Sequence, residues 1–435
     1  AVRLKHELPN YGTFDEMRLF QPGPLPEPVV LRGTMIGVPI CEDIWRSEVC
    51  RHLADFGAEM FICINGSPYE INKDALRIEG VAKRRAVDTG LPLAYLNRVG
   101  GQDELVFDGA SFVVNGDGNL AVQLADWEEQ VAETRWTRTA QGWRCDRGVQ
   151  AALAGHPEDI YCAMVLALRD YVRRNGFPGV VLGLSGGIDS ATCAAIAVDA
   201  LGAERVWGVM MPSRFTSRQS LDDAAACADA LGIRYSVLPI GEAVAGFDSM
   251  LGESFEGTNR DIAEENLQSR IRGTALMALS NKFGPMVMAT GNKSEMSVGY
   301  ATIYGDMAGG YNPLKDAYKS TVFALARWRN RQVPRIGLGP AGAVIPDSTL
   351  SRAPSAELRP DQRDSDSLPD YAVLDPILVG LVEHDKSVDQ LVREGFVRET
   401  VQAVERLLHR AEYKRRQASP GVKLTARNFG RDRRY

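Results

Sequence analysis

Short apolar runs alternate with amphipathic stretches of helical period through the second half of the chain. The apolar runs are Val180–Leu184, Val206–Met211, Tyr235–Pro239 and Met286–Ala289, and the first amphipathic stretch is Glu158–Asn175. Strands that alternate with helices in this way are typical of a parallel, doubly wound sheet. Ligands bind such a sheet at the carboxyl ends of its strands, so we expect functional residues in the turns that follow these runs.

The first third of the chain shows a less regular alternation of the same kind. The apolar runs that predict strands there are Thr34–Ile40, Met60–Asn65, Leu93–Val99, Phe112–Asn115 and Leu120–Leu124. Helices are predicted over about Ser47–Phe56 and Lys73–Thr89. The last two runs flank Gly116-Asp117-Gly118, which is typical of a hairpin turn. From Glu128 to His156 the pattern breaks into short fragments, so we place a boundary near Ala151–Pro157 and expect domains at 1–150 and 151–435.

The composition narrows the class of protein. The chain has 435 residues, 45% apolar and 24% charged, with a net charge of −6, which is ordinary globular composition and argues against nucleic acid as a partner. No stretch approaches the run of about 18 apolar residues that a membrane helix needs, so no membrane partner is expected. Seven cysteines without Cys-x-x-Cys spacing favour the reducing cytoplasm. Because the chain starts at Ala1 within a motif, we expect an N-terminally incomplete copy of a longer protein.

The turn after the run Val180–Leu184 carries the strongest chemical signal. It reads Ser185-Gly186-Gly187-Ile188-Asp189-Ser190 and opens an Ala-rich helix. Adjacent glycines and a helix start together favour phosphate binding. No Gly-Lys-Ser/Thr ends the turn, so it is not a Walker loop, and Asp189 instead indicates a Mg²⁺ ion that accompanies ATP. The alternative is a glycine turn that merely closes a βα unit. The string resembles the pyrophosphate loop of the ATP pyrophosphatases, which implies that Ser185, Gly186, Gly187, Asp189 and Ser190 bind ATP.

Cys41 stands between the predicted strand Thr34–Ile40 and a predicted helix, where a helix start can lower a thiol's pKa and stabilise an oxyanion. The alternative is a buried structural thiol. The region resembles the nitrilase superfamily, whose triad of glutamate, lysine and cysteine implies catalytic roles for Lys5 and Cys41. The triad glutamate would lie upstream of Ala1, which leaves the amidase activity of this chain an open question. The same resemblance implies a glutamine pocket formed by Tyr11, Glu42 and Ser67.

Two later stretches resemble the NAD synthetases. These are Thr290-Gly291-Asn292-Lys293-Ser294-Glu295, with Tyr304-Gly305-Asp306 beyond it, and the helix Glu264–Gly273. The resemblance implies that Thr290 binds ATP and that Glu295 joins Asp189 as a metal ligand. It also implies that deamido-NAD contacts Arg270, Arg272, Asp306 and Lys319.

Two further segments have unusual composition. Gly337–Tyr371 is rich in Pro, Ser, Asp and Gly, which predicts either disorder or a lid. Its stretch Ala353–Leu358 resembles the family's mobile loop, which implies that Ser355 joins the metal when the lid closes. The segment Arg406–Tyr435 has ten Lys and Arg residues against two acids. We interpret this charge as a site for dinucleotide phosphates, with Lys414 and Arg415 as the contacts.

Together the sequence predicts an α/β chain with an incomplete nitrilase-like α-β-β-α domain, followed by a doubly wound synthetase domain of the adenine nucleotide alpha hydrolase type. The resemblance to the glutamine-dependent NAD synthetases implies amidation of deamido-NAD with ATP, Mg²⁺ and ammonia from glutamine. We also expect a homo-oligomer. Three alternatives stay open: another amidotransferase of this loop type, such as a GMP or asparagine synthetase; a nitrilase-type amidase with a nucleotide-binding half; and a non-catalytic nucleotide sensor. The nitrilase-like half argues against the first, and the metal acids argue against the third.

Overall fold

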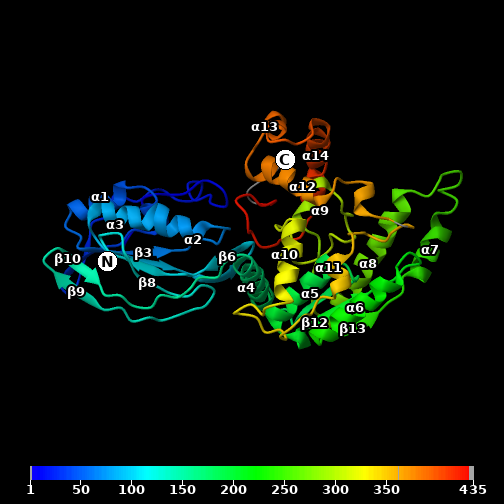
Figure 1. Cartoon of the computed structure of the whole chain (residues 1–435), viewed down its shortest axis with the longest axis horizontal. Helices are drawn as coiled ribbons and strands as arrows, with labels where there is room; N and C mark the ends of the chain where they lie inside the picture. Colours follow the sequence, from blue (N-terminus) through cyan, green and yellow to red (C-terminus); the bar gives the residue numbers. More distant parts are fainter. Residues whose placement is uncertain (1, 361, 431–435) are drawn as a thin grey trace. The chain divides into compact units, whose positions relative to one another are not determined.

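A computed structural model describes residues 2–360 and 362–430. The chain divides into two compact units (Figure 1). The first comprises Ala1–Gly100 and Leu105–Gly155, and the second comprises Gly101–Glu104 and His156–Tyr435. The main division after Gly155 falls inside the interval Ala151–Pro157 where the sequence pattern breaks. The assignment of Gly101–Glu104 to the second unit was not predicted, because it rests on contacts with residues far along the chain, such as the ion pair between Glu104 and Lys315.

The first unit is built on a six-stranded sheet. Its strand order is β1-β2-β3-β4-β7-β8, in which β2, β3 and β4 run parallel and the other neighbours antiparallel. The strands are β1 (Val29–Leu31), β2 (Thr34–Gly37), β3 (Met60–Asn65), β4 (Leu93–Asn97), β7 (Phe112–Val114) and β8 (Leu120–Gln123). The helical segments are η1 (Cys41–Ile44), α1 (Glu48–Asp55), α2 (Lys73–Ala75), the π-helical η2 (Leu76–Ala82) and α3 (Lys83–Thr89). Val49 and Leu53 of α1 and Ala86 of α3 share one apolar core with Phe61 and Leu93 of the sheet, so these two helices pack on the sheet.

Two small hairpins of the first half were missed by the sequence pattern. They are β5 (Val99–Gln102) with β6 (Leu105–Asp108), and β9 (Trp136–Thr139) with β10 (Gly142–Cys145). Three of the four residues of β9 are exposed, so this strand has no apolar face and shows no alternation of apolar and polar residues. The hairpin β9–β10 therefore lies in the stretch that the sequence presented only as a break in the pattern.

The second unit contains the predicted parallel sheet, with strand order β13-β12-β11-β14. The strands are β11 (Val180–Gly183), β12 (Val206–Met210), β13 (Arg234–Val237) and β14 (Met286–Val287). The helices around it are α4 (Glu158–Arg174), α5 (Ile188–Leu201), α6 (Arg218–Leu231), α7 (Gly241–Leu251) and α8 (Ile262–Phe283), and the 3-10 turn η3 (Ala203–Arg205) follows α5. All residues of β12 are buried, as expected for a strand covered on both faces. The predicted doubly wound fold of this half is confirmed.

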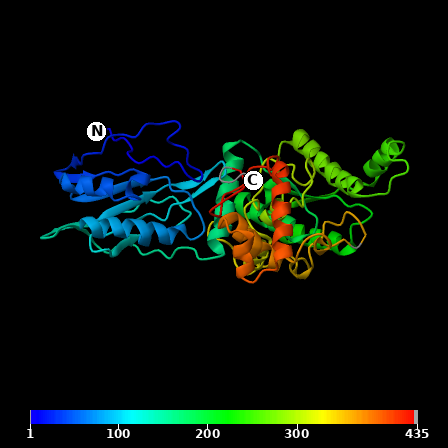
Figure 2. The ribbon, with the colours of Figure 1, turned by 90° about the horizontal axis from the view of Figure 1, so that it is seen from above.

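The remaining helices gather at the C-terminal part of the second unit. They are α9 (Lys293–Val298), α10 (Lys319–Arg329), α11 (Asp347–Ser351), η4 (Asp364–Asp366), α12 (Tyr371–Leu378), the π-helical η5 (Val379–Glu383), α13 (Val388–Arg393), α14 (Arg398–Arg410) and α15 (Glu412–Arg415). Figures 1 and 2 both show α12, α13 and α14, in orange to red, as one group. Met296 of α9, Leu374 of α12 and Val401 of α14 lie in one apolar core, which fixes α9 against the C-terminal helices.

The segment Gly337–Tyr371 is not a structureless connector. Leu338 donates its backbone N–H to the Asp199 carbonyl oxygen (2.9 Å), and α11 and η4 lie within the segment. Arg352 donates to the carbonyl oxygen of Gly186 (2.9 Å), and Glu357 accepts from Ser217 and Ser220. Long-range contacts that composition does not reveal hold the described residues of the segment on the glycine turn, which argues against the alternative of simple disorder. Its predicted closure as a lid stays a prediction, and Asp361 lies outside the described residues.

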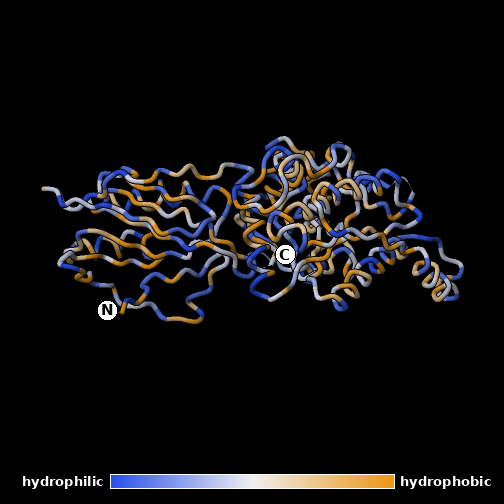
Figure 3. Tube along the Cα trace, turned by 90° about the horizontal axis from the view of Figure 1, so that it is seen from below, coloured by the Kyte–Doolittle hydropathy of each residue, from blue (hydrophilic) through white to orange (hydrophobic). Residues whose placement is uncertain are grey.

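Apolar residues, in orange, recur along the chain in both units and alternate with hydrophilic residues, in blue (Figure 3). Within residues 2–360 and 362–430, no helix combines the length and the apolar character that crossing a bilayer requires. All seven cysteines are free thiols, and six of them are buried.

Candidate active sites of the two units

The glycine turn after β11 is held in place by its own serines. Ser190 Oγ donates to the Gly187 carbonyl oxygen (3.0 Å) and accepts the backbone N–H of Ser185 (3.2 Å). Gly186 has a φ of +80°, and a Cβ there would lie 2.4 Å from the Ser220 carbonyl oxygen. The turn therefore requires glycine at position 186. The helix α5 begins at Ile188, two residues before the predicted start, so Asp189 belongs to its first turn.

Lys319 forms ion pairs with both predicted metal ligands, Asp189 and Glu295. Its Nζ lies 2.6 Å from Asp189 Oδ2 and 3.0 Å from Glu295 Oε1, and only 2% of the lysine side chain is exposed. Burial raises the pKa of Glu295 to about 7, while Lys319 opposes the rise. Burial lowers the pKa of Lys319, but the carboxylates of Asp189 and Glu295 outweigh this effect and raise it above its ordinary value. Two acids 106 positions apart in sequence, Asp189 and Glu295, thus converge on one cation.

Asn292 is a site residue that the sequence analysis did not single out. Its side-chain oxygen accepts the backbone N–H of Glu295 (3.0 Å) and so caps α9, while its Nδ2 donates to Asp189 Oδ1 (3.0 Å). The side chain is fully buried. The capping half of this role was readable, because Asn followed three residues later by Glu is a capping-box signature. The contact with Asp189 was not readable, because it joins segments that are distant in sequence.

The turn and the acids line one cavity of about 360 Å³. Of the residues predicted to bind nucleotide or metal, the following line it: Ser185, Gly187, Asp189, Ser190, Arg272, Thr290, Glu295, Asp306, Lys319, Ser355 and Lys414. Asp306 accepts the backbone N–H of Thr302 (2.6 Å). Burial raises the pKa of Asp306, although hydrogen bonds to its carboxylate oppose the rise. Burial lowers the pKa of Arg272, whose Nε donates to the Met211 carbonyl oxygen.

Four residues predicted for this site are placed differently from the others. Gly186 belongs to the turn, but it is not among the residues that line the cavity. Arg415 is buried and donates to the carbonyl oxygens of Ser297 (2.9 Å) and Leu408 (2.7 Å), so it braces the C-terminal helices and does not line the cavity. Arg270 is exposed, donates to the Ile303 carbonyl oxygen and is likewise not among the lining residues. Ser355 lines the cavity, but its hydroxyl donates to the Gln362 carbonyl oxygen rather than being directed at Asp189 or Glu295. The basic residues Arg431, Arg433 and Arg434 of the tail lie outside the described residues.

Cys41 lies in a strained backbone conformation in the first unit. Its φ is +49°, in the left-handed region that few side chains adopt, and such strain is frequent at functional sites. It opens the 3-10 turn η1, and α1 begins at Glu48, next to the predicted helix start at Ser47. Burial raises the pKa of the Cys41 thiol, while the Lys5 ammonium and a hydrogen bond from the Gly66 backbone lower it. Lys5, whose role the nitrilase resemblance implies, lies close enough to lower the pKa of this thiol, and its catalytic role stays a prediction.

Glu16 is the close partner of Lys5. The Lys5 Nζ lies 2.8 and 2.7 Å from the two carboxylate oxygens of Glu16, a pairing that the sequence analysis missed because Glu16 follows in a loop without periodicity. Tyr11 donates its hydroxyl to Glu42 (2.8 Å), which brings two predicted glutamine-binding residues together. Ser67 is buried, and its hydroxyl accepts from Arg77 Nε (3.1 Å), so this oxygen is already engaged in the free protein.

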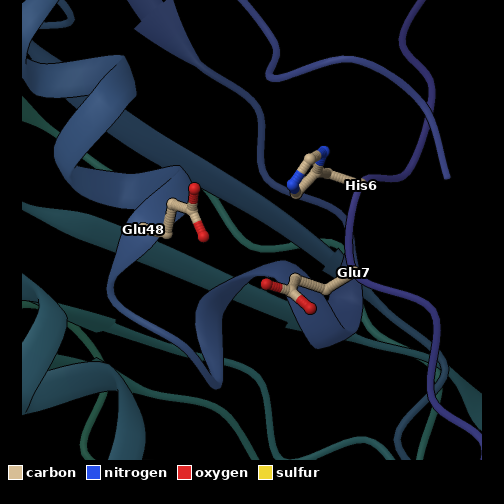
Figure 4. A group of neighbouring side chains, drawn as sticks. All are labelled: His6, Glu7 and Glu48. Atoms are coloured by element: carbon tan, nitrogen blue, oxygen red, sulfur yellow. The ribbon is translucent and has the colours of Figure 1, made fainter.

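A separate group of side chains has metal-binding residue types. Figure 4 shows His6, Glu7 and Glu48, whose candidate ligand atoms lie within 4.8 Å of one another. His6 Nδ1 is bonded to the Gly23 carbonyl oxygen (2.7 Å), Glu7 is paired with Arg46, and Glu48 is exposed. We assign no metal to this group, because half-exposed charged residues of this kind are ordinary on protein surfaces.

The comparisons with known proteins agree with this division. Residues 2–144 match the carbon-nitrogen hydrolase family and residues 160–418 match the NAD synthase family. A glutamine-dependent NAD(+) synthetase of Rhodobacter capsulatus is 54% identical over all of this chain and 79% of its own length, and that of Acinetobacter baylyi is 45% identical with the same coverage. A solved structure of the Acinetobacter baumannii glutamine-dependent NAD+ synthetase in complex with ADP is similar at a TM-score of 0.76 and 44% identity, over 99% of this chain and 77% of that chain.

A nucleotide-binding α/β unit with a glycine turn and an acid–lysine set, joined to a carbon-nitrogen hydrolase unit, defines an amide-forming ligase that takes nitrogen from an amide donor. Both family matches and the relatives point to one kind of ligase within this class. The chain belongs to the glutamine-dependent NAD(+) synthetase family.

Proposed function

We propose that this chain amidates deamido-NAD to NAD, with ATP as the energy source and glutamine as the nitrogen source. One observation carries the assignment of the synthetase site: the glycine turn, the acid–lysine set of Asp189, Glu295 and Lys319, and Asp306 all line the same cavity. A phosphate-binding turn next to buried charges is what transfer of an adenylyl group requires. The family of the chain supports the same substrates.

The reaction in the synthetase unit has two steps. A carboxylate oxygen of the nicotinate group attacks the α-phosphorus of ATP, and the bond to pyrophosphate breaks. The resulting adenylate has a good leaving group, so ammonia attacks its carbonyl carbon, AMP departs with the bonding electrons, and one proton is lost from the nitrogen. We assign the Ser185–Ser190 turn to the departing pyrophosphate, and Lys319 to the negative charge that develops during transfer. Arg272, Asp306 and Lys414 would position the dinucleotide.

Mg²⁺ fits the carboxylates at this site. Asp189 and Glu295 offer oxygen ligands, which Mg²⁺ prefers, and their convergence on the ammonium of Lys319 marks a place that attracts positive charge. When bound with ATP, Mg²⁺ would lower the cost of negative charge on the phosphates. Ser355, which lines the same cavity, would join these ligands only if its hydroxyl turned away from Gln362.

In the first unit, we assign the nucleophile to the Cys41 sulfur. The sulfur attacks the side-chain amide carbon of glutamine, the C–N bond breaks, and the nitrogen leaves as ammonia after it gains a proton; water then hydrolyses the thioester to glutamate. Lys5 lies close enough to Cys41 to lower its pKa, so its ammonium can stabilise the negative charge that develops during attack. Tyr11 and Glu42 would contact the substrate.

The experiment measures AMP, pyrophosphate and NAD from ATP and deamido-NAD, with ammonia or glutamine as the nitrogen source. We expect all three products with ammonia, in equal amounts. Deamido-NAD-independent release of pyrophosphate would contradict the proposal, and so would glutamine hydrolysis without any nucleotide product. The cytoplasmic location and the homo-oligomeric state stay predictions, and mass measurement in solution tests the second.

A further inference from the structure

Three consecutive side chains of α9 point to three different parts of the second unit. Glu295 lines the cavity and contacts Lys319. Lys293 is fully buried and contacts Asp316 (2.7 Å), Glu383 and the C-terminal segment at Thr425 (2.7 Å). Ser294, also fully buried, faces α12 and α10. The helix α9, which carries the predicted metal ligand Glu295, is thus held by polar contacts of Lys293 and Ser294.

The contacts of Ser294 and Asp375 form a continuous link. Ser294 Oγ donates to Asp375 Oδ1 (2.5 Å) and accepts the backbone N–H of Lys319 (2.9 Å). The other oxygen of Asp375 accepts the backbone N–H of Ser320 (2.8 Å). Asp375 is 3% exposed. One buried carboxylate therefore holds the first residues of α10 directly and through the serine.

The anchor of this link is rigid. Asp375 belongs to α12, whose Leu374, Ile377 and Leu378 are fully buried in the apolar core that also contains Met296 of α9. Lys319 is the first residue of α10, so its Cα position follows from the two hydrogen bonds at the helix start. A shift there moves Nζ relative to Asp189 and Glu295.

We propose that Asp375 and Ser294 are positioning residues that set the place of Lys319, and with it the geometry of the charges in the synthetase cavity. The inference rests on the proposed function, because it gives Lys319 a role in adenylyl transfer. Asp375 is not among the residues that line the cavity, and its two carboxylate oxygens bind Ser294 and the backbone of α10. It acts through Lys319, and it does not contact the nucleotide.

The test uses the full chain with ammonia as nitrogen source, and the variants Ser294→Ala, Asp375→Asn and their combination. A misplacement of about 1 Å costs about 100-fold in rate, so we expect kcat to fall by about this factor in Ser294→Ala and by less in Asp375→Asn, which keeps an acceptor for Ser320. The KM for ATP should change little, because the glycine turn is untouched. The double variant should be no slower than Ser294→Ala, because both changes remove the same hydrogen bond between Ser294 and Asp375, so their effects do not add.

Tyr161→Phe is the matched control. The Tyr161 hydroxyl donates to Asp199 (2.8 Å) and both side chains are fully buried in the same unit, away from the cavity lining. It should lose a similar hydrogen bond while kcat stays near the parent value. Amide hydrogen exchange of the peptide around Lys319 provides a readout independent of activity: it should become faster in Ser294→Ala and Asp375→Asn and stay unchanged in Tyr161→Phe.

The proposal is overturned if folded Ser294→Ala keeps the parent kcat, if Tyr161→Phe loses as much rate as Ser294→Ala, or if the losses in the double variant multiply. If Ser294→Ala does not fold, the isosteric Asp375→Asn and the control decide through kcat and hydrogen exchange. A parent chain that forms no AMP with ammonia would instead contradict the proposed function, and exchange at Lys319 would still test the positioning role.

Discussion

Lys319 carries a positive charge on a side chain with almost no exposed surface. Two carboxylates within 3.0 Å of its Nζ offset the free-energy cost of burying this charge. An unpaired buried ammonium would lose its proton or destabilise the fold. The ammonium of Lys319 also offsets the repulsion between the neighbouring carboxylates of Asp189 and Glu295. The charges of the site are therefore interdependent, and each substitution among them alters the others.

Asp189→Asn should abolish adenylation with either nitrogen source. The change removes a charged oxygen ligand and one of the two carboxylates at Lys319, and the expected loss in rate is on the order of a thousandfold. Pyrophosphate release at saturating Mg²⁺ measures it. Asp222→Asn, on an exposed acid paired with Arg218, is the control and should keep the parent rate. A near-normal rate in Asp189→Asn would mean that this residue only shapes the turn.

The reactivity of Cys41 should depend on two neighbouring charges with opposite signs. Burial holds the thiol's pKa above its ordinary value, Lys5 lowers it, and Glu16 raises it. Because only the thiolate is alkylated, reactivity at pH 8 rises as the pKa falls. Lys5→Met should therefore slow alkylation of Cys41 by iodoacetamide at pH 8, and Glu16→Gln should accelerate it.

Peptide mass analysis after timed alkylation across pH 7 to 10, a range chosen around the ordinary thiol pKa of about 8.5, locates the modified cysteine. The buried Cys50, whose burial raises its pKa to about 12, serves as an internal control that should react slowly in every variant. If Lys5→Met left the rate at Cys41 unchanged, the electrostatic coupling of these two residues would be absent in solution.

At the scale of elements, the glycine turn is formed by more than its own residues. Thr349 of α11 donates to the Gly186 carbonyl oxygen (3.2 Å), Arg352 donates to the same oxygen, and the Ser220 carbonyl oxygen of α6 leaves no room for a Cβ at position 186. The turn is thus enclosed by α6 and by the segment that follows α10.

Gly186→Ala should reduce kcat/KM for ATP by about 100-fold, because the turn must shift to relieve the contact with Ser220. Gly202→Ala is a matched control: its φ of +85° is equally left-handed, but no atom lies within 4 Å of the added Cβ. The control should lose stability by about 1–3 kcal/mol from backbone strain and keep its kinetics for ATP. Steady-state kinetics with varied ATP and thermal unfolding separate the two effects. Equal losses of kcat/KM in both variants would show that backbone strain, and not the contact with Ser220, causes the loss.

At the scale of the whole molecule, the two units carry separate chemistry. Lys5, Cys41 and Glu16 belong to the first unit, and all residues that line the cavity beside the glycine turn belong to the second. Each unit has its own apolar core. We therefore expect a substitution at the thiol to leave the adenylation site unchanged.

Cys41→Ser should reduce glutamine-dependent synthesis to background and keep ammonia-dependent synthesis close to the parent rate. A serine hydroxyl has too high a pKa for Lys5 to activate it. NAD formation with each nitrogen source is compared in parent and variant, and Cys145→Ser at a buried thiol of the same unit is the control for loss of folding. Retained glutamine-dependent activity would exclude Cys41 as the nucleophile, and loss of the ammonia-dependent reaction would show that the units are not separable.

The sequence by itself determined the local features of this protein. The strand, glycine turn and helix from Val180 to Leu201 follow from apolar periodicity and turn chemistry, which act over a few residues. The same is true of the strand Met60–Asn65 and the helix at Glu158. The residue types and local settings of Cys41 and Asp189 were enough to indicate their chemistry, whereas the role of Glu295 was implied only by the resemblance to the NAD synthetases.

Tertiary structure alone decided which partners these residues have. Lys319 lies 130 positions from Asp189, and Asp375 lies 81 positions from Ser294, so no local pattern links them. The segment Gly337–Tyr371 reads as a loop by composition, yet contacts with Gly186, Asp199 and Ser217 order it. Short-range propensity fixes elements, whereas the packing of elements around the apolar cores of the second unit fixes the distances between charged groups, and these distances make the site.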